Sequence, residues 1–230
     1  MSGRVLTLVG HDARLQYRYG IYIAYAFVLA FYLAVLLGAG PFLPAWVPAL
    51  IIFTDPAALG FFFLGALMML EKSEGVRAAL AITPIGPGDY LIGKVATLTT
   101  MATLSSALLV FVHGAPNPPL ILVTVVLTSV MYVGIGVPIA LRFKTVNGYL
   151  IGSSGFLMPI IAPGFVALID PTPVWMLVLP AAAQFKLMLV ATGAGTASMG
   201  EIAFMLVVCT IAAAGGLWLG YRALITELGR

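Results

Sequence analysis

Residues 88–94, GDYLIGK, have the GxxxxGK spacing with which a phosphate-binding loop begins. In such a loop the backbone N–H groups and the lysine hold the phosphates, and a Ser or Thr after the lysine holds magnesium. Here Val95 follows the lysine, no strand-like run precedes the glycine, and a long apolar run comes next. We therefore expect no nucleotide site here, and we expect Lys94 to extend towards lipid headgroups.

Asp55 is the most unusual polar residue, because it lies inside a long apolar run. A charge at such a position is costly and usually faces a cavity or a partner. Three hypotheses stand. Asp55 caps a helix that restarts at Pro56, or it lines a path for cationic compounds, or it lies nearer the membrane surface than the run suggests.

The other reactive side chains form no catalytic or metal-binding set. His11 and His113 lie far apart, with His113 in a turn rich in Gly and Pro, and no hydroxyl has a base near it in sequence. Cys209 sits in an apolar run and is expected to pack there. Asp170 and Glu201 are expected to cap helices or to face water, and Lys186 could pair with either.

The elements that carry these residues are predicted to be transmembrane helices. The chain is 62% hydrophobic and 8% charged, whereas soluble domains carry about 25% charged residues. Long apolar runs containing Gly and Pro favour helices over a barrel. We predict a single all-α membrane domain over residues 1–230, with six spans near 20–40, 47–70, 90–112, 119–141, 148–169 and 202–222.

A further apolar stretch, 173–192, decides the topology. If it dips into the membrane and returns, within a re-entrant region 170–200, both termini lie on one side, together with ten of the eleven basic residues. The positive-inside rule makes that side cytoplasmic, in the cell membrane. If the stretch crosses instead, the C-terminal arginines move outside. We prefer the re-entrant arrangement, in which the basic residues of the inner face are Arg4, Arg14, Arg18, Lys72, Arg77, Lys94, Arg142, Lys144, Arg222 and Arg230.

Two segments are predicted at the inner face. Residues 1–19 have Val5, Leu8 and Leu15 at roughly helical spacing, which predicts an amphipathic interfacial helix. Residues 71–94 are the longest polar interruption, and their first part, 71–88, is predicted to be a cytoplasmic segment. A short helix is expected over 71–82 that ends before Pro84. A turn at 86–88 follows, and Asp89 is expected to cap the next span. Such a segment is either an ordinary solvated loop or a stiff lever on which a cytoplasmic partner acts.

The same segment resembles the signature of type-2 ABC exporter permeases. These proteins carry E-x-x-x-G, a T/S-P pair and Y-L-x-x-K between their second and third spans. The corresponding residues here are Glu71 to Gly75, Thr83-Pro84 and Tyr90 to Lys94. Asp55-Pro56, followed by the phenylalanine run 61–63, is similar to the branch that exports fluoroquinolones and related drugs.

The resemblance implies a permease without enzymatic activity that pairs with a second permease, identical or sister, and with two cytoplasmic ATPase subunits. ATP and magnesium would be held by the ATPase and no cofactor by this chain. The substrate would be an amphipathic compound, and nucleic acid is not expected as a partner. The implied coupling residues are Glu71, Lys72, Glu74, Gly75, Arg77, Thr83 and Pro84, and the implied permease–permease contact is Gly148, Gly152 and Gly155. The alternative is a secondary transporter or channel that has no ATPase partner.

Overall fold

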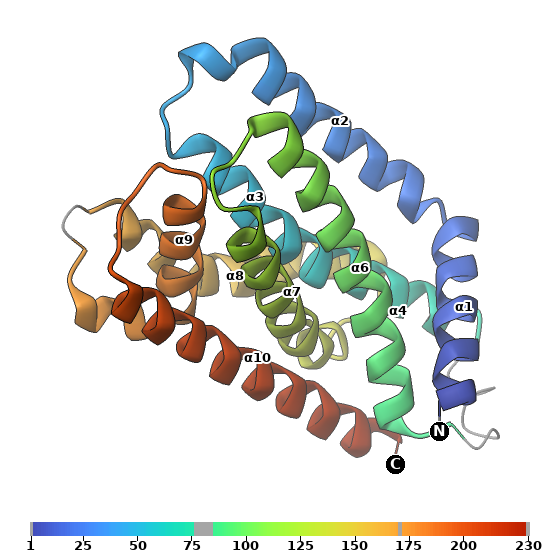
Figure 1. Cartoon of the computed structure of the whole chain (residues 1–230). Helices are drawn as coiled ribbons and strands as arrows, with labels where there is room; N and C mark the ends of the chain where they lie inside the picture. Colours follow the sequence, from blue (N-terminus) through green and yellow to red (C-terminus); the bar gives the residue numbers. More distant parts are fainter. Residues whose placement is uncertain (1, 76–84, 170–171, 229–230) are drawn as a thin grey trace.

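The computed structural model describes residues 2–75, 85–169 and 172–228, and the ordered elements within these ranges are helical. Figure 1 shows them as a bundle of long helices with shorter ones at its margins. In chain order the helices are α1 Ser2–Arg18, α2 Ile21–Ala39, η1 Gly40–Phe42, α3 Val47–Ala58, η2 Leu59–Phe63, α4 Leu64–Ser73, α6 Pro87–His113, α7 Pro118–Ala140, α8 Val146–Ile161, η3 Ala162–Leu168, η4 Val174–Val178, α9 Pro180–Ala191 and α10 Met199–Leu228.

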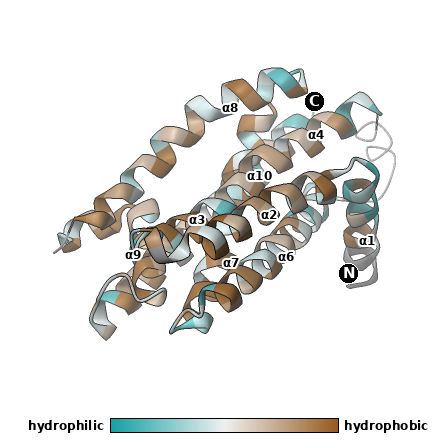
Figure 2. Cartoon of the chain, turned by 90° about the horizontal axis from the view of Figure 1, so that it is seen from above, coloured by the Kyte–Doolittle hydropathy of each residue, from teal (hydrophilic) through white to brown (hydrophobic). Residues whose placement is uncertain are grey.

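Six helical stretches of the described chain are long and apolar enough to cross a membrane, which confirms the number of spans predicted from the sequence. Two of them are composite, because α3, η2 and α4 run on as residues 47–73 and α8 continues into η3. Figure 2 shows hydrophobic residues along the middles of the helices and hydrophilic ones mainly at their ends. The protein is therefore a multi-pass membrane protein.

The second span does not break at Asp55, so the prediction that Asp55 caps a restarted helix is wrong. Pro56 lies inside α3, which continues to Ala58 and then passes into the π-helical turn η2. Proline lacks the N–H of a helical hydrogen bond, and π turns commonly mark such irregular places. The backbone can continue because the surrounding residues of this stretch are buried in the protein.

Glycine pairs bring α7 close to its neighbours. A Cβ added at Gly134 would lie 2.2 Å from the carbonyl carbon of Gly216 in α10, and one at Gly136 would lie 2.5 Å from the carbonyl oxygen of Gly60. The small residues of α10 at Gly216 and Gly220 therefore serve helix packing within this chain.

The glycines predicted at a permease–permease contact are placed differently from one another. Gly152 is covered by the ring of Phe143 from the same chain, and a Cβ there would lie 2.3 Å from that ring. Gly148 follows the capping residue Thr145, and Gly155 has open space around it. Close approach by a second chain at these positions stays a prediction, and Gly155 offers the least obstructed surface for it.

The stretch that decides the topology forms two short helices, η4 and α9. The 12 residues of α9 cover about 18 Å at 1.5 Å per residue, well short of a membrane span. The Asn117 N–H donates to the Ala191 carbonyl at 3.2 Å, so the end of α9 lies at the turn between α6 and α7. The start of α1 and the end of α10 lie towards the other end of the bundle, in both Figure 1 and Figure 2.

Candidate functional site

Three charged side chains from different helices meet in the interior, at the end of the bundle where α1 lies. Lys94 of α6 bonds to Asp12 of α1 and to Glu71 of α4. Their exposed fractions are 2%, 6% and 1%, respectively. We call these three residues the buried ion cluster. It joins the N-terminal helix to the end of the second span and to the beginning of the third.

Neighbouring polar groups complete the bonding of the two carboxylates. Gln16 donates to Asp12 at 2.9 Å and to the Thr97 hydroxyl at 2.8 Å, and that hydroxyl is 2.6 Å from Asp12. The Tyr90 hydroxyl donates to Glu71 at 2.6 Å. A cavity of about 30 Å³ adjoins the cluster, large enough for roughly one water. The cluster is thus closely packed and has no room for a phosphate.

The structure corrects three expectations about this end of the bundle. Lys94 does not reach towards headgroups, because both carboxylates hold it in the interior. Glu71 does not lie on an exposed helix over 71–82, because α4 continues to Ser73 and buries this side chain. Asp89 is not the N-cap of α6. Gly86 takes that place, and Asp89 accepts its N–H at 3.2 Å.

The polar side chains at the end of α4 and just after it are exposed. Glu74 forms a solvent-exposed ion pair with Arg18 at 3.4 Å, and Lys72 is exposed as well. Burial and the nearby Glu74 carboxylate raise the pKa of Tyr19 to about 12. Gly75 has a φ of +72°, a left-handed conformation that favours glycine and turns the chain away from α4. The other predicted coupling residues, Arg77, Thr83 and Pro84, lie outside the described residues.

Asp55 forms a second buried junction. Both of its carboxylate oxygens lie 2.7 Å from the Tyr25 hydroxyl of α2, and the Ser105 hydroxyl of α6 donates to it at 2.7 Å. Asp55 is 0% exposed, so its carboxylate is enclosed by the protein, and its depth in the membrane stays a prediction. Its hydroxyl partners belong to the first and third spans, which makes Asp55 a link between three helices. A contribution to a substrate path stays a prediction.

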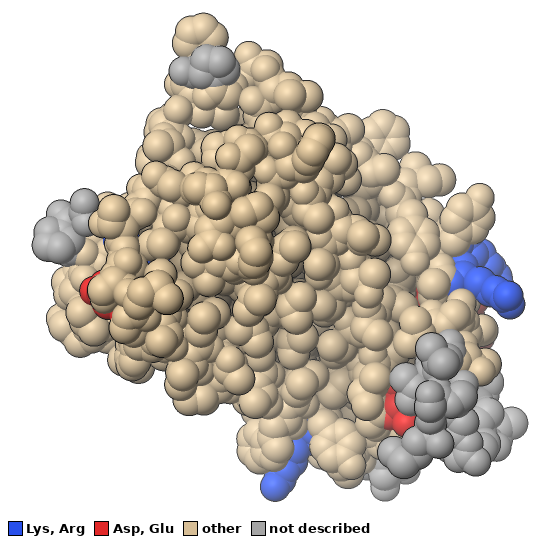
Figure 3. Space-filling view, viewed as in Figure 1, with Lys and Arg blue, Asp and Glu red and all other residues tan. Residues whose placement is uncertain are grey.

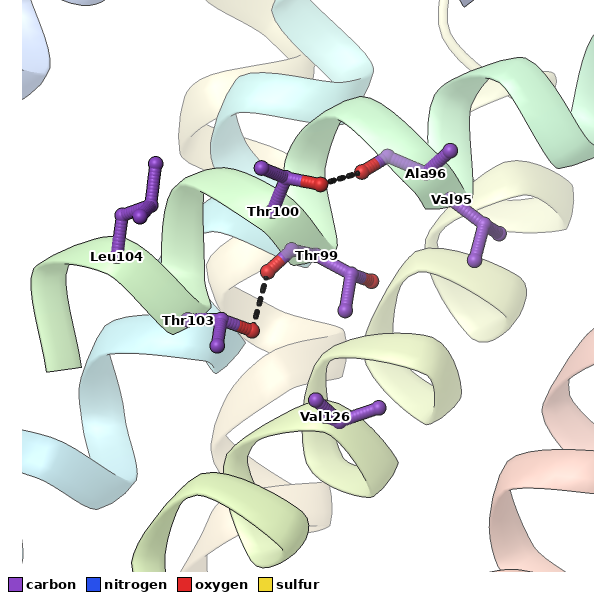
Figure 4. Close-up of a pocket in the computed structure, with 7 residues that line it drawn as sticks. All are labelled: Val95, Ala96, Thr99, Thr100, Thr103, Leu104 and Val126. Atoms are coloured by element: carbon purple, nitrogen blue, oxygen red, sulfur yellow. Dashed lines mark hydrogen bonds between the residues drawn. The ribbon is translucent and has the colours of Figure 1, made fainter. Parts of the chain in front are cut away.

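A groove of about 360 Å³ opens between α6 and α7 (Figure 4). Thr100 donates its hydroxyl to the Ala96 carbonyl and Thr103 to the Thr99 carbonyl, each at 2.7 Å. Since these protons are used within α6, the threonine oxygens retain only lone pairs for any further partner. Leu104 and Val126 supply an apolar rim.

The remaining residues singled out in the sequence are those that could bind a metal, react as a thiol or cap a helix. No group of three or more His, Cys, Asp or Glu able to hold a metal occurs among the described residues. Cys209 is buried and free, as expected of a packing residue. Ser198 and Glu201 cap the start of α10 by bonding to each other. Asp170 lies outside the described residues.

Sequence reasoning missed Asp12, Gln16 and Thr97. The available signal was Asp12 itself, an acidic residue in a basic segment, with Gln16 one helical turn later on the same face. The spacing of Val5, Leu8 and Leu15 predicts an amphipathic helix that turns its apolar side chains to the membrane. In the structure Asp12 and Gln16 face the interior beside Leu15, and Tyr17 is exposed. The buried face of α1 is therefore partly polar.

Comparison with known proteins gives a consistent result. The chain is 27% identical over 165 residues to two curated proteins of Mycobacterium tuberculosis, from strains CDC 1551 and H37Rv, each named a fluoroquinolones export permease protein. The matched region covers 71% of this chain and 70% of each relative. No family model matches the chain, and no solved structure matches it. The resemblance to drug-export permeases is thereby confirmed.

Proposed function

Starting from this resemblance to export permeases, we propose that the chain is the transmembrane subunit of an ATP-driven ABC exporter. It would move drugs or other amphipathic compounds out of the cell, and a separate subunit would bind ATP with magnesium and hydrolyse it. Six membrane-length helices and the similarity to two named permeases support a transport role. The ATPase partner is the more specific part of this proposal.

The buried ion cluster is the observation that supports coupling to such a partner. Glu71 lies near the end of α4 and Lys94 in the first part of α6, on either side of the segment between these helices, and the two residues bind each other. Asp12 adds α1 to the same connection. A force applied to the segment would therefore reach three helices together, whereas a loop without a buried anchor would yield alone.

The anchor divides the predicted coupling residues into two roles. Glu71 is buried and holds the segment in place. Lys72, Glu74 and Gly75 are exposed and could contact an ATPase subunit directly. We assign Arg77, Thr83 and Pro84 to the contact as well, from the sequence resemblance alone.

The proposed assembly has two permeases and two ATPase subunits. Both termini and the α4–α6 segment would face the cytoplasm, in agreement with the excess of basic residues predicted for that side. η4 and α9 would form the re-entrant region on the outer side, since α9 is too short to cross. Gly155 on α8, with Gly148 about two helical turns before it, would approach the second permease.

The experiment is co-purification of the tagged chain with an ABC ATPase subunit from the same cells, followed by measurement of ATP hydrolysis. Charge reversal of the exposed residues, in the variant Lys72→Glu with Glu74→Lys, should lower association at least about tenfold, because each lost charged contact is worth about 1.5–3 kcal/mol. Lys144→Glu is the matched control, since this exposed lysine lies in the α7–α8 loop. All variants should insert and purify alike.

Unchanged association of the charge-reversed variant would contradict the proposed contact. Failure of any ATPase to co-purify or to support export would favour a secondary transporter or channel instead. Glu71→Lys is unsuitable for this test, because it places a second positive charge against Lys94 and would disturb folding.

A further inference from the structure

Lys186 lies in the middle of α9 with its side chain almost wholly removed from solvent. Its exposed fraction is 6%, and its neighbours Phe185 and Leu187 are 0% exposed. A lysine ammonium has three N–H donors. Among the described residues, Lys186 takes part in no hydrogen bond and no ion pair. A buried ammonium that donates no hydrogen bond is costly, so this position favours an anionic group in direct contact with it.

Lys186 lines a cavity that could admit such a group. The cavity has a volume of about 350 Å³ and lies between η4, α9 and the beginning of α10. That volume is within the range of small-molecule sites, roughly 300–1,000 Å³. The lining combines one apolar side, formed by Leu177 and Ala197, with the hydroxyl groups of Thr172, Thr196 and Ser198.

Glu201 also lines the cavity and interacts electrostatically with Lys186, but the two side chains form no ion pair. Its carboxylate accepts the Ser198 N–H at 2.7 Å and the Ser198 hydroxyl at 3.0 Å, as the cap of α10. The Glu201 side chain is half-buried, whereas Lys186 is buried. An entering molecule would thus meet a negative charge outside and a positive charge inside, an order that disfavours multiply charged anions.

We propose that this cavity binds the carboxylate of a small amphipathic molecule, with Lys186 as its counter-charge. The apolar body would lie against Leu177 and Ala197, and a single negative charge would enter past Glu201. The lysine supplies a point charge with rotatable donors, which suits one carboxylate. This binding requires no ATPase, so it stands apart from the proposed coupling.

The test measures binding of benzoate, with benzamide as the uncharged control, to the full-length chain in lipid nanodiscs. Saturation-transfer NMR titration should show saturable binding of benzoate and weaker binding of benzamide. Lys186→Gln should weaken benzoate binding at least about tenfold, because a hydrogen bond to a charged group is lost. Lys186→Arg, which keeps the positive charge, should retain most of the affinity.

Glu201→Gln provides an independent variant, because glutamine also completes a capping box and should leave α10 intact. Benzoate binding should become stronger, by up to about fivefold, once the like charge of Glu201 is removed. Equal binding of benzoate and benzamide would overturn the proposal. So would unchanged affinity in Lys186→Gln or weaker binding in Glu201→Gln. Loss of ATPase association would leave all these results as they are.

Discussion

Replacing Lys94 with methionine should destabilise this protein by about 3–5 kcal/mol. Methionine is close to lysine in shape, so the change removes the charge and leaves the packing largely in place. The carboxylates of Asp12 and Glu71, which are 6% and 1% exposed, would lose their common counter-charge and repel each other. Most of this destabilisation comes from leaving two uncompensated charges in the interior, and the lost attraction to Lys94 contributes less.

The measurement is thermal unfolding of the purified chain, followed by tryptophan fluorescence in detergent. At about 2–4 °C per kcal/mol for a chain of this size, the midpoint should fall by roughly 6–20 °C. Lys72→Met is the matched control, because Lys72 is exposed one residue after Glu71. It should change stability by about 0.5 kcal/mol or less.

A rescue experiment separates lost charge balance from lost packing. Adding Asp12→Asn and Glu71→Gln to Lys94→Met removes the unpaired charges while keeping polar side chains of similar size. The triple variant should recover much of the lost stability, since replacing a whole buried ion cluster costs far less than breaking it. A triple variant no more stable than Lys94→Met alone, or a single variant as stable as Lys72→Met, would refute the reasoning.

Three other predictions concern the rest of the fold. Asp55→Ala should cost about 1–3 kcal/mol, because it leaves the buried Tyr25 hydroxyl without an acceptor. The Ser105 hydroxyl can still donate to the Ala102 carbonyl at 2.9 Å. Asp55→Asn should cost less stability in the same unfolding assay. In a transport assay, export of a cationic compound by Asp55→Asn at the wild-type rate would contradict a charge-attracting role for Asp55. Gly134→Ala should lower the unfolding midpoint by forcing α7 from α10, at about 1–3 kcal/mol, whereas Gly155→Ala, with open space around it, should be close to neutral. Asn117→Ala should cost about 0.5–2 kcal/mol by removing the cap of α7, seen as early amide exchange at the start of that helix.

Much of the architecture could be predicted from the sequence, because a membrane span is a local property. About 20 consecutive apolar residues suffice to indicate one, and the six predicted spans match the six observed to within several residues. The hypothesis that a helix restarts at Pro56, one of the three for Asp55, is wrong for a related reason. Local rules place proline at the first turn of a helix, whereas the tertiary environment around α3 lets the chain continue through it.

The polar sites were harder to predict, because their partners lie far apart in the chain. Lys94 and Asp12 are 82 residues apart, and Lys94 and Glu71 are 23 apart. From sequence, Lys94 had a reasonable alternative in the lipid headgroups, and Glu71 one in solvent. Only the packing of α1 and α4 against α6 removes both alternatives.

The sequence by itself determined that this protein is a helical membrane protein with a polar segment between its second and third spans, and it carried the resemblance to export permeases. Composition, apolar run length and short motifs are properties of neighbouring residues, so they can be read along the chain. The tertiary structure decided which charges are buried together, which glycines serve internal packing, and that Lys186 faces a cavity without a protein partner among the described residues. Burial and pairing depend on residues brought together from distant positions, and local patterns do not specify them.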